Sequence, residues 1–184
     1  MTAPDARQAT LQTLRSWDAP TLQQSVLQRR FVDHLQVHSD GLLRSCRPDH
    51  LTASVLVMSP DTSQVLLTLH AKAGQWFQLG GHLEPTDADV VAAATREARE
   101  ESGICGLTLD PEPVHLDEHP VPFCGDDTHH LDVRFVAVAD PRTGHQVSDE
   151  SSDLRWWAAE ELPGTDLAEL VELGRDRVLG VRRP

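Results

Sequence analysis

The sequence predicts an α/β fold, a layered domain in which helices pack on a β-sheet, with a helical addition at its N-terminus. Residues 5–38 contain apolar side chains at helical spacing and no glycine. Residues 51–58 are apolar and rich in β-branched side chains, as in a buried strand. Residues 87–102 are rich in alanine and contain neither glycine nor proline, which favours a helix. Helices and strands in this order are typical of an α/β layered domain.

The N-terminal segment is expected to form helices interrupted near Asp18-Ala-Pro20. Apolar side chains fall on one face on each side of this break: Leu11 and Leu14 before it, and Leu27, Phe31 and Leu35 after it. We expect residues 1–48 to be a helical extension packed on the main domain, residues 49–184. The alternative is that the apolar stripe forms the interface of a homodimer.

The segments after residue 50 change to the spacing of strands. Residues 51–58 and 64–70 flank the turn Ser59-Pro-Asp-Thr-Ser63, so a β-hairpin is expected. Apolar and charged residues alternate over 131–139, which predicts a strand with one buried face. A short strand over 154–157 and a last helix from Thr165 or Asp166 to Leu173 complete the predicted elements.

The composition limits the classes of partner. The formal charge of −13 disfavours a large nucleic acid, because an acidic surface repels a phosphate backbone. No apolar run approaches the ~20 residues needed to cross a bilayer, and no apolar signal core opens the chain, so a cytoplasmic protein without a membrane partner is expected. The cysteines Cys46, Cys105 and Cys124 have neither disulfide nor zinc-site spacing, and we expect buried, reduced thiols.

A cluster of glutamates carries the chemistry. Glu97, Glu100 and Glu101 lie at positions i, i+3 and i+4, so a helix places their carboxylates on one face. Such like charges repel one another, and Mg²⁺, which prefers carboxylate oxygens, supplies the missing attraction. Arg96 can orient a carboxylate or contact phosphate. The opposite face is apolar and small, as close packing on a sheet requires: Val90, Ala94 and Ala98.

At these residues the sequence resembles the Nudix family, whose signature is Gly, five residues, Glu, seven residues, then Arg-Glu-apolar-x-Glu-Glu-x-Gly-apolar. The matching residues are Gly81, Arg96, Glu97, Ala98, Glu100, Glu101, Gly103 and Ile104. Two departures precede the metal-binding face. Asp87 stands in place of the first glutamate, and one extra residue separates it from Arg96. Either Asp87 or Asp89 could therefore cap the helix. The resemblance covers residues 50–175 and implies an α/β/α sandwich with a mixed sheet.

The resemblance also implies an activity: Mg²⁺-dependent hydrolysis of a diphosphate linkage in a small nucleoside diphosphate derivative, with Mn²⁺ as an alternative metal. It suggests Glu97, Glu100 and Glu101 as metal ligands, together with the Gly80 carbonyl, with Arg96 among the catalytic residues. A further carboxylate often comes from a loop nearer the C-terminus, and we predict Glu150 for this role as ligand and base. The rival interpretation is that the acidic residues around Glu150 form only a polar turn.

Substrate contacts are predicted at the start of the 131–139 strand. His130, Asp132 and Arg134 share one face there and could line a pocket, whereas a solvated strand face is the alternative. His82 directly follows the two glycines, so it is expected to lie near the metal-binding residues. A structural hydrogen bond is an equally good explanation for a histidine at this position.

Two other functions fit the same fold. A non-catalytic Nudix-like sensor of nucleotide derivatives is disfavoured because such proteins usually lose ligand glutamates. An isoprenoid-diphosphate isomerase would need a well-placed cysteine, and Cys105 and Cys124 stand in no recognisable motif.

Overall fold

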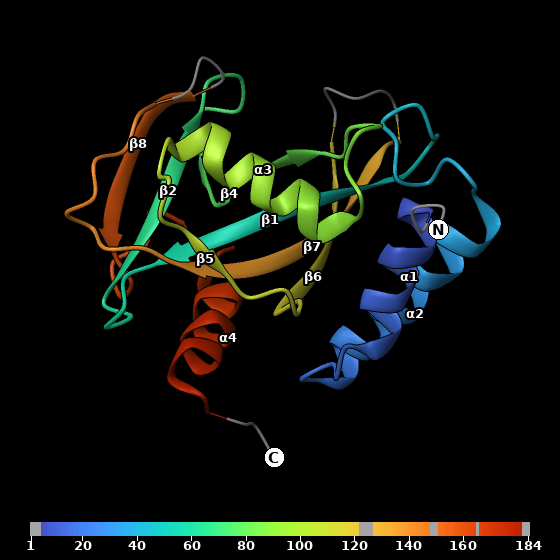
Figure 1. The fold of residues 1–184 in the computed structure, drawn as a ribbon, viewed down its shortest axis with the longest axis horizontal. Coiled ribbons are helices and arrows are strands. Elements are labelled where there is room, and N and C mark those ends of the chain that lie inside the picture. The colour runs from blue at the N-terminus through green and yellow to red at the C-terminus, as the bar shows by residue number, and fades with distance from the viewer. Residues whose placement is uncertain (1–4, 122–126, 148–150, 165, 182–184) are drawn as a thin grey trace.

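The computed structural model describes residues 5–121, 127–147, 151–164 and 166–181. Its strands form one mixed sheet, with helix α3 on one face and helix α4 on the other (Figure 1). The helices are α1 (Ala6–Ser16), α2 (Leu22–Val37), α3 (Val90–Ser102) and α4 (Ala168–Leu179). The strands are β1 (His50–Met58), β2 (Gln64–His70), β3 (Trp76–Phe77), β4 (Leu79–His82), β5 (Thr108–Leu109), β6 (His115–Pro120), β7 (His129–Val138) and β8 (Ser151–Ala158).

Strand β1 organises the sheet. It turns into β2 as the predicted antiparallel hairpin, with Met58 opposite Val65. On its other side it runs parallel to β7 in a register that begins with His50 opposite His130. Strand β4 pairs antiparallel with the first half of β1, and β6 pairs antiparallel with β7. The parallel pair joins segments about eighty residues apart, so this register cannot arise from a local turn.

Both faces of the central strands are buried. Ala53 lies in the core on the side of α3, together with Ala94, while Leu56 and Val136 approach Gly174 of α4 on the other side. The prediction that the 131–139 strand has only one buried face is therefore wrong. Its charged residues face the side of the sheet that α4 packs against, and Asp132 retains only 1% of its surface exposed.

The N-terminal helices pack on the sheet and on α3. Their apolar stripe is buried, with Leu14, Phe31 and Leu35 fully covered. Polar contacts fix the packing further. The Thr10 hydroxyl accepts a hydrogen bond from the Val90 backbone N–H at 3.1 Å, at the first residue of α3. The Gln24 side chain bonds both backbone groups of Leu116 in β6. These contacts satisfy buried polar groups of both parts at once.

Several elements differ from the predictions. Strand β6 was not predicted, because its sequence His-Leu-Asp-Glu-His-Pro is mostly polar and it is held by pairing with β7. Helix α4 runs to Leu179, beyond the predicted end, and β8 starts at Ser151. Cys46 is buried as expected, whereas Cys105 is exposed. None of the described helices has the length and apolar character of a membrane span.

Candidate active site

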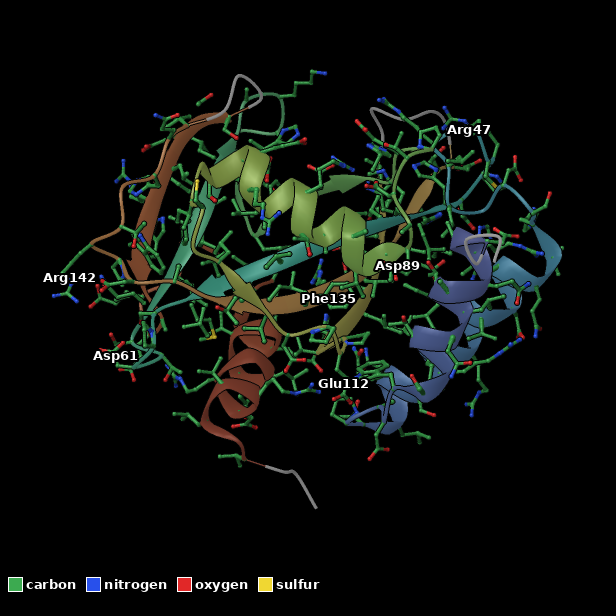
Figure 2. The ribbon with its side chains drawn as sticks, viewed as in Figure 1. Arg47, Asp61, Asp89, Glu112, Phe135 and Arg142 are labelled. Atoms are coloured by element: carbon green, nitrogen blue, oxygen red, sulfur yellow. The ribbon has the colours of Figure 1, made fainter. Side chains whose placement is uncertain are left out.

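Helix α3 begins and ends on residues suited to those positions. Asp89 is the N-cap, and its side chain accepts a hydrogen bond from the Ala92 backbone N–H at 2.8 Å. In Figure 2 Asp89 lies at the end of α3 that faces α1. The helix ends at Gly103, whose φ of 66° is left-handed and suits glycine. The capping role left open between Asp87 and Asp89 therefore belongs to Asp89.

Asp87 instead joins a network centred on Arg96. The Arg96 guanidinium donates to both oxygens of Asp87, at 3.1 and 2.9 Å. It also donates to Glu97 at 2.9 Å and to Glu100 at 3.0 Å from one nitrogen, and to the His82 carbonyl at 3.0 Å. The hydrogen bonds that Arg96 donates to Asp87, then to Glu97 and Glu100, raise the pKa of Arg96 well above its ordinary value. Burial opposes ionisation of Asp87, but the bonds from Arg96 outweigh it and lower the pKa of Asp87.

The double glycine brings the sheet against α3. The Gly80 backbone N–H donates to the Glu101 carboxylate at 2.8 Å. A Cβ at position 81 would lie 2.7 Å from the Glu97 carboxylate oxygen Oε1, so glycine here lets that carboxylate keep its position against β4. These contacts bring β4 and all three glutamates of α3 into one site. The metal-ligand role predicted for the Gly80 carbonyl stays a prediction.

Negative charge exceeds positive charge in this network. The guanidinium of Arg96 pairs with three carboxylates, those of Asp87, Glu97 and Glu100. Glu100 keeps 60% of its side-chain surface exposed, so its carboxylate is open to a further cation. The donors are hard carboxylate oxygens on one helix face, which suits Mg²⁺. The residues present therefore fit a divalent cation of this kind.

Glu150, the predicted additional carboxylate, lies outside the described residues. The chain on either side of it is placed. The Gln146 backbone N–H donates to the Ser102 carbonyl at 2.8 Å, at the last residue of α3. Ser151 opens β8, where its hydroxyl accepts a hydrogen bond from Thr68 at 2.6 Å. Gln146, four residues before Glu150 in the sequence, therefore lies at the C-terminal end of the glutamate helix.

The predicted substrate contacts lie in a separate polar network on the other face of the sheet. Asp132 accepts hydrogen bonds from four side chains: Thr52 at 2.9 Å, Ser54 at 2.7 Å, Gln78 at 3.2 Å and Arg134 at 2.8 Å. Arg134 also pairs with Asp117 at 2.8 Å. Burial opposes the charge on Asp132, but Arg134 and these hydrogen bonds lower its pKa. Substrate contact by His130, Asp132 and Arg134 remains a prediction, and for Asp132 the geometry favours a structural role.

His130 belongs to a group of imidazoles beside this network. The rings of His50, His82 and His130 lie 4.9–5.2 Å apart between centroids. Burial, reinforced by the neighbouring imidazoles, lowers the pKa of His82 to about 4 and that of His130 to about 3. These two rings are therefore neutral near pH 7. Sequence reasoning missed the group because His50 and His130 meet only through the parallel register of β1 and β7.

A mixed sheet and a helix that presents three glutamates and an arginine beside a Gly-Gly strand define an α/β protein with a carboxylate-rich site. A match to the NUDIX domain spans residues 48–179, and the chain belongs to the Nudix family. The family and the α/β fold predicted from the sequence are both confirmed. Among curated protein sequences no relative matches the chain.

Solved structures share this fold. A NUDIX-family hydrolase from Clostridium perfringens is 25% identical and superposes with a TM-score of 0.55, over 72% of this chain and 97% of that one. An Ap4A hydrolase from C. elegans is 20% identical, with a TM-score of 0.58 over 71% and 96% of the two chains. The NUDIX domain of Shewanella oneidensis NrtR, complexed with ADP ribose, is 17% identical, with a TM-score of 0.57 over 73% and 92%.

Proposed function

We propose that this protein hydrolyses a diphosphate linkage in a nucleoside diphosphate derivative, with Mg²⁺ as its metal and Mn²⁺ as an alternative. The observation that carries the proposal is the surplus of carboxylates around Arg96 on one face of α3. A diphosphate substrate adds more negative charge, so a carboxylate-rich site binds it only with cations that reverse the local field. The fold supports the same class of reaction.

In this proposal Glu97, Glu100 and Glu101, with the Gly80 carbonyl, would hold the metal. Bound Mg²⁺ neutralises phosphate charge and lowers the pKa of water. Arg96 orients Glu97 and Glu100 through its single bridging nitrogen, and the Gly80 N–H fixes Glu101. Glu150 would act as a further ligand or as the group that takes the proton from water.

The substrate is proposed as a class. One structural neighbour is named an Ap4A hydrolase and another is complexed with ADP ribose, and both ligands are small nucleoside diphosphate derivatives. The net charge of −13 disfavours a large nucleic acid. Substrate contact by His130, Asp132 and Arg134 stays a prediction, and the hydrogen bond from Arg134 to Asp132 would hold Arg134 in position. A cytoplasmic location and a homodimer stay predictions.

A panel of substrates tests the proposal. The panel comprises nucleoside triphosphates, dinucleoside polyphosphates, sugar nucleotides, dinucleotide cofactors, coenzyme A derivatives and isoprenoid diphosphates, each incubated with and without Mg²⁺ and analysed by mass spectrometry. We expect cleavage products from at least one nucleotide compound, only with the metal. Binding without products would instead indicate a sensor, and an isoprenoid product of unchanged mass would indicate an isomerase. The variant Glu150→Gln should lower kcat far more than it changes KM if Glu150 is the base.

A further inference from the structure

Three histidines from three strands meet on one face of the sheet. His50 begins β1 and lies opposite His130 of β7, while His82 of β4 pairs with Thr52, two residues after His50. Side chains two residues apart on a strand point to the same side. Gly81 faces Glu97 of α3, so His82, the next residue, points to the opposite side. The three imidazoles are therefore on the far side of the sheet from the glutamate helix.

The histidine group contains polar atoms that the fold does not satisfy. His50 is fully buried, and neither ring nitrogen has a hydrogen-bond partner of ordinary geometry within the described ranges. The Cys46 backbone interacts with the ring without reaching that geometry. Buried polar groups are normally hydrogen-bonded, and an exception calls for a ligand, an ion or a water. Asp132 nearby, by contrast, is bonded by four side chains.

The geometry points to a metal. Three nitrogens, one from each imidazole, lie within 4.8 Å of one another. Zinc binds histidine at about 2.0–2.1 Å, and small ring rotations would bring all three nitrogens to one ion. We propose that His50, His82 and His130 bind a divalent transition metal such as Zn²⁺, at a site distinct from the carboxylates of α3. Neutral imidazoles select this class of metal over Mg²⁺, which prefers oxygen ligands.

The surroundings fit such a centre. With three protein ligands, a tetrahedral ion keeps one position open. Asp132 supplies negative charge to His130, whereas Arg44 and Arg47 supply positive charge to His50 and His82. Figure 2 shows Arg47 in the segment that leads into β1. The arginines favour an anion at the open position. The backbone of Cys46 beside His50 can orient that ring, as groups behind metal ligands commonly do.

Another group with suitable atoms, Asp49, Glu118 and His129, is explained without an ion. Arg30 pairs with Asp49 at 2.5 Å and with Glu118 at 3.4 Å, so a protein cation already neutralises these carboxylates. His129 also lies 3.3 Å from Asp49. His129 directly precedes His130, so His129→Gln offers a matched control one residue away.

The test is a titration of the metal-free full chain with Co²⁺ in excess Mg²⁺, followed by visible absorption and by thermal unfolding. Co²⁺ in a tetrahedral site with nitrogen ligands absorbs far more strongly than octahedral Co²⁺ on carboxylates. We expect one tetrahedral Co²⁺ per chain, displaced by Zn²⁺, and a metal-dependent rise in Tm. His82→Gln and His130→Gln should each weaken binding by more than the roughly 10- to 100-fold that loss of a supporting group causes.

The controls separate this site from the others. His129→Gln and Glu100→Gln should keep the tetrahedral spectrum and the affinity for Co²⁺. The proposal is overturned if His82→Gln and His130→Gln, folded by circular dichroism, bind Co²⁺ like the wild type. It is equally overturned if binding is lost in His129→Gln or if only the weak octahedral spectrum appears. None of these outcomes depends on hydrolase activity, so failure here and failure of the proposed function are distinguishable.

Discussion

Two acidic networks lie on opposite faces of the same sheet and differ in how their charge is balanced. On the side of α3, Arg96 bridges Asp87, Glu97 and Glu100, and Glu100 remains mostly exposed. On the other side, the carboxylate of Asp132 is buried and receives hydrogen bonds from Thr52, Ser54, Gln78 and Arg134. The first network has charge left for a cation, whereas the second is complete without one.

The comparison teaches how to separate a reactive cluster from a structural one. Both contain an arginine among carboxylates, and from sequence both were predicted to contact metal or substrate. A buried carboxylate persists only when donors satisfy it, because the cost of removing a charge from water is large. Carboxylates at i, i+3 and i+4 repel one another, and a cation bound between them would remove that repulsion. Substitutions in the two networks should therefore affect different properties.

The largest expected effect is on turnover. Glu100→Gln and Glu101→Gln should each lower kcat by on the order of 100-fold or more, because the loss of a ligand leaves phosphate charge uncompensated. Their Tm should change little. Removing divalent ions from the wild type should abolish activity, and Mg²⁺ or Mn²⁺ should restore it. The matched control is Glu160→Gln, an exposed glutamate outside the site, which should behave as the wild type. Near-normal turnover in both folded variants would refute the metal assignment.

Deletion of residues 1–48 tests whether the domain that carries both networks needs the N-terminal extension for its stability. The deletion exposes apolar core and removes the Thr10 acceptor at the start of α3. We expect lower solubility or a Tm reduced by more than any single substitution here, with a smaller change in kcat of the folded fraction. The measurement is thermal unfolding alongside an assay of the soluble protein. A truncated protein with normal Tm and no turnover would place catalytic groups in the extension.

Asp132→Asn should have the opposite effect to that expected for Glu100→Gln: a loss of stability with little change in kinetics. An asparagine at position 132 carries no charge to pair with Arg134, and its NH2 group replaces an oxygen that accepts hydrogen bonds in the wild type. We therefore expect the free energy of unfolding to fall by about 3 kcal/mol. Urea unfolding measures this loss, and kinetics on the folded protein show whether KM is spared. A stable Asp132→Asn variant with a raised KM would instead make Asp132 a substrate contact and erase the distinction between the networks.

The smallest expected effect extends the comparison to a buried imidazole. His34 is 6% exposed and stacks on His38, and burial followed by the charges of His38 and Arg30 lowers its pKa to about 4 despite the nearby Asp49. Between about pH 6.5 and 4 the His34 imidazole therefore binds a proton more readily in the unfolded chain than in the folded protein. This group should remove up to about 1.4 kcal/mol of stability per pH unit as pH falls through that window.

Urea unfolding at pH 7 and pH 5 compares the wild type with His34→Asn. The variant should lose less stability than the wild type over this interval, because it lacks the group that takes up the proton. Equal losses in the two proteins would show that His34 is not responsible. Other histidines with lowered pKa values titrate in both proteins and cancel in the difference.

The sequence by itself determined the features that depend on local spacing. The β1–β2 hairpin follows from its turn residues, and the shared face of Glu97, Glu100 and Glu101 follows from the helical repeat. The position of Arg96 four residues before Glu100 likewise predicted their ion pair, and Gly103 marked the helix end. Each of these interactions joins residues close in the chain, so the backbone geometry alone brings them together.

Only the tertiary structure decided which distant groups meet. It assigned the cap to Asp89 and gave Asp87 to Arg96. It buried Asp132 against Thr52 and Ser54, and it placed His50 beside His82 and His130. These outcomes depend on the register of β1 with β4 and β7, and a shift of one residue would turn every side chain to the other face. That register is set by burial of the whole core, which no local spacing in the sequence specifies.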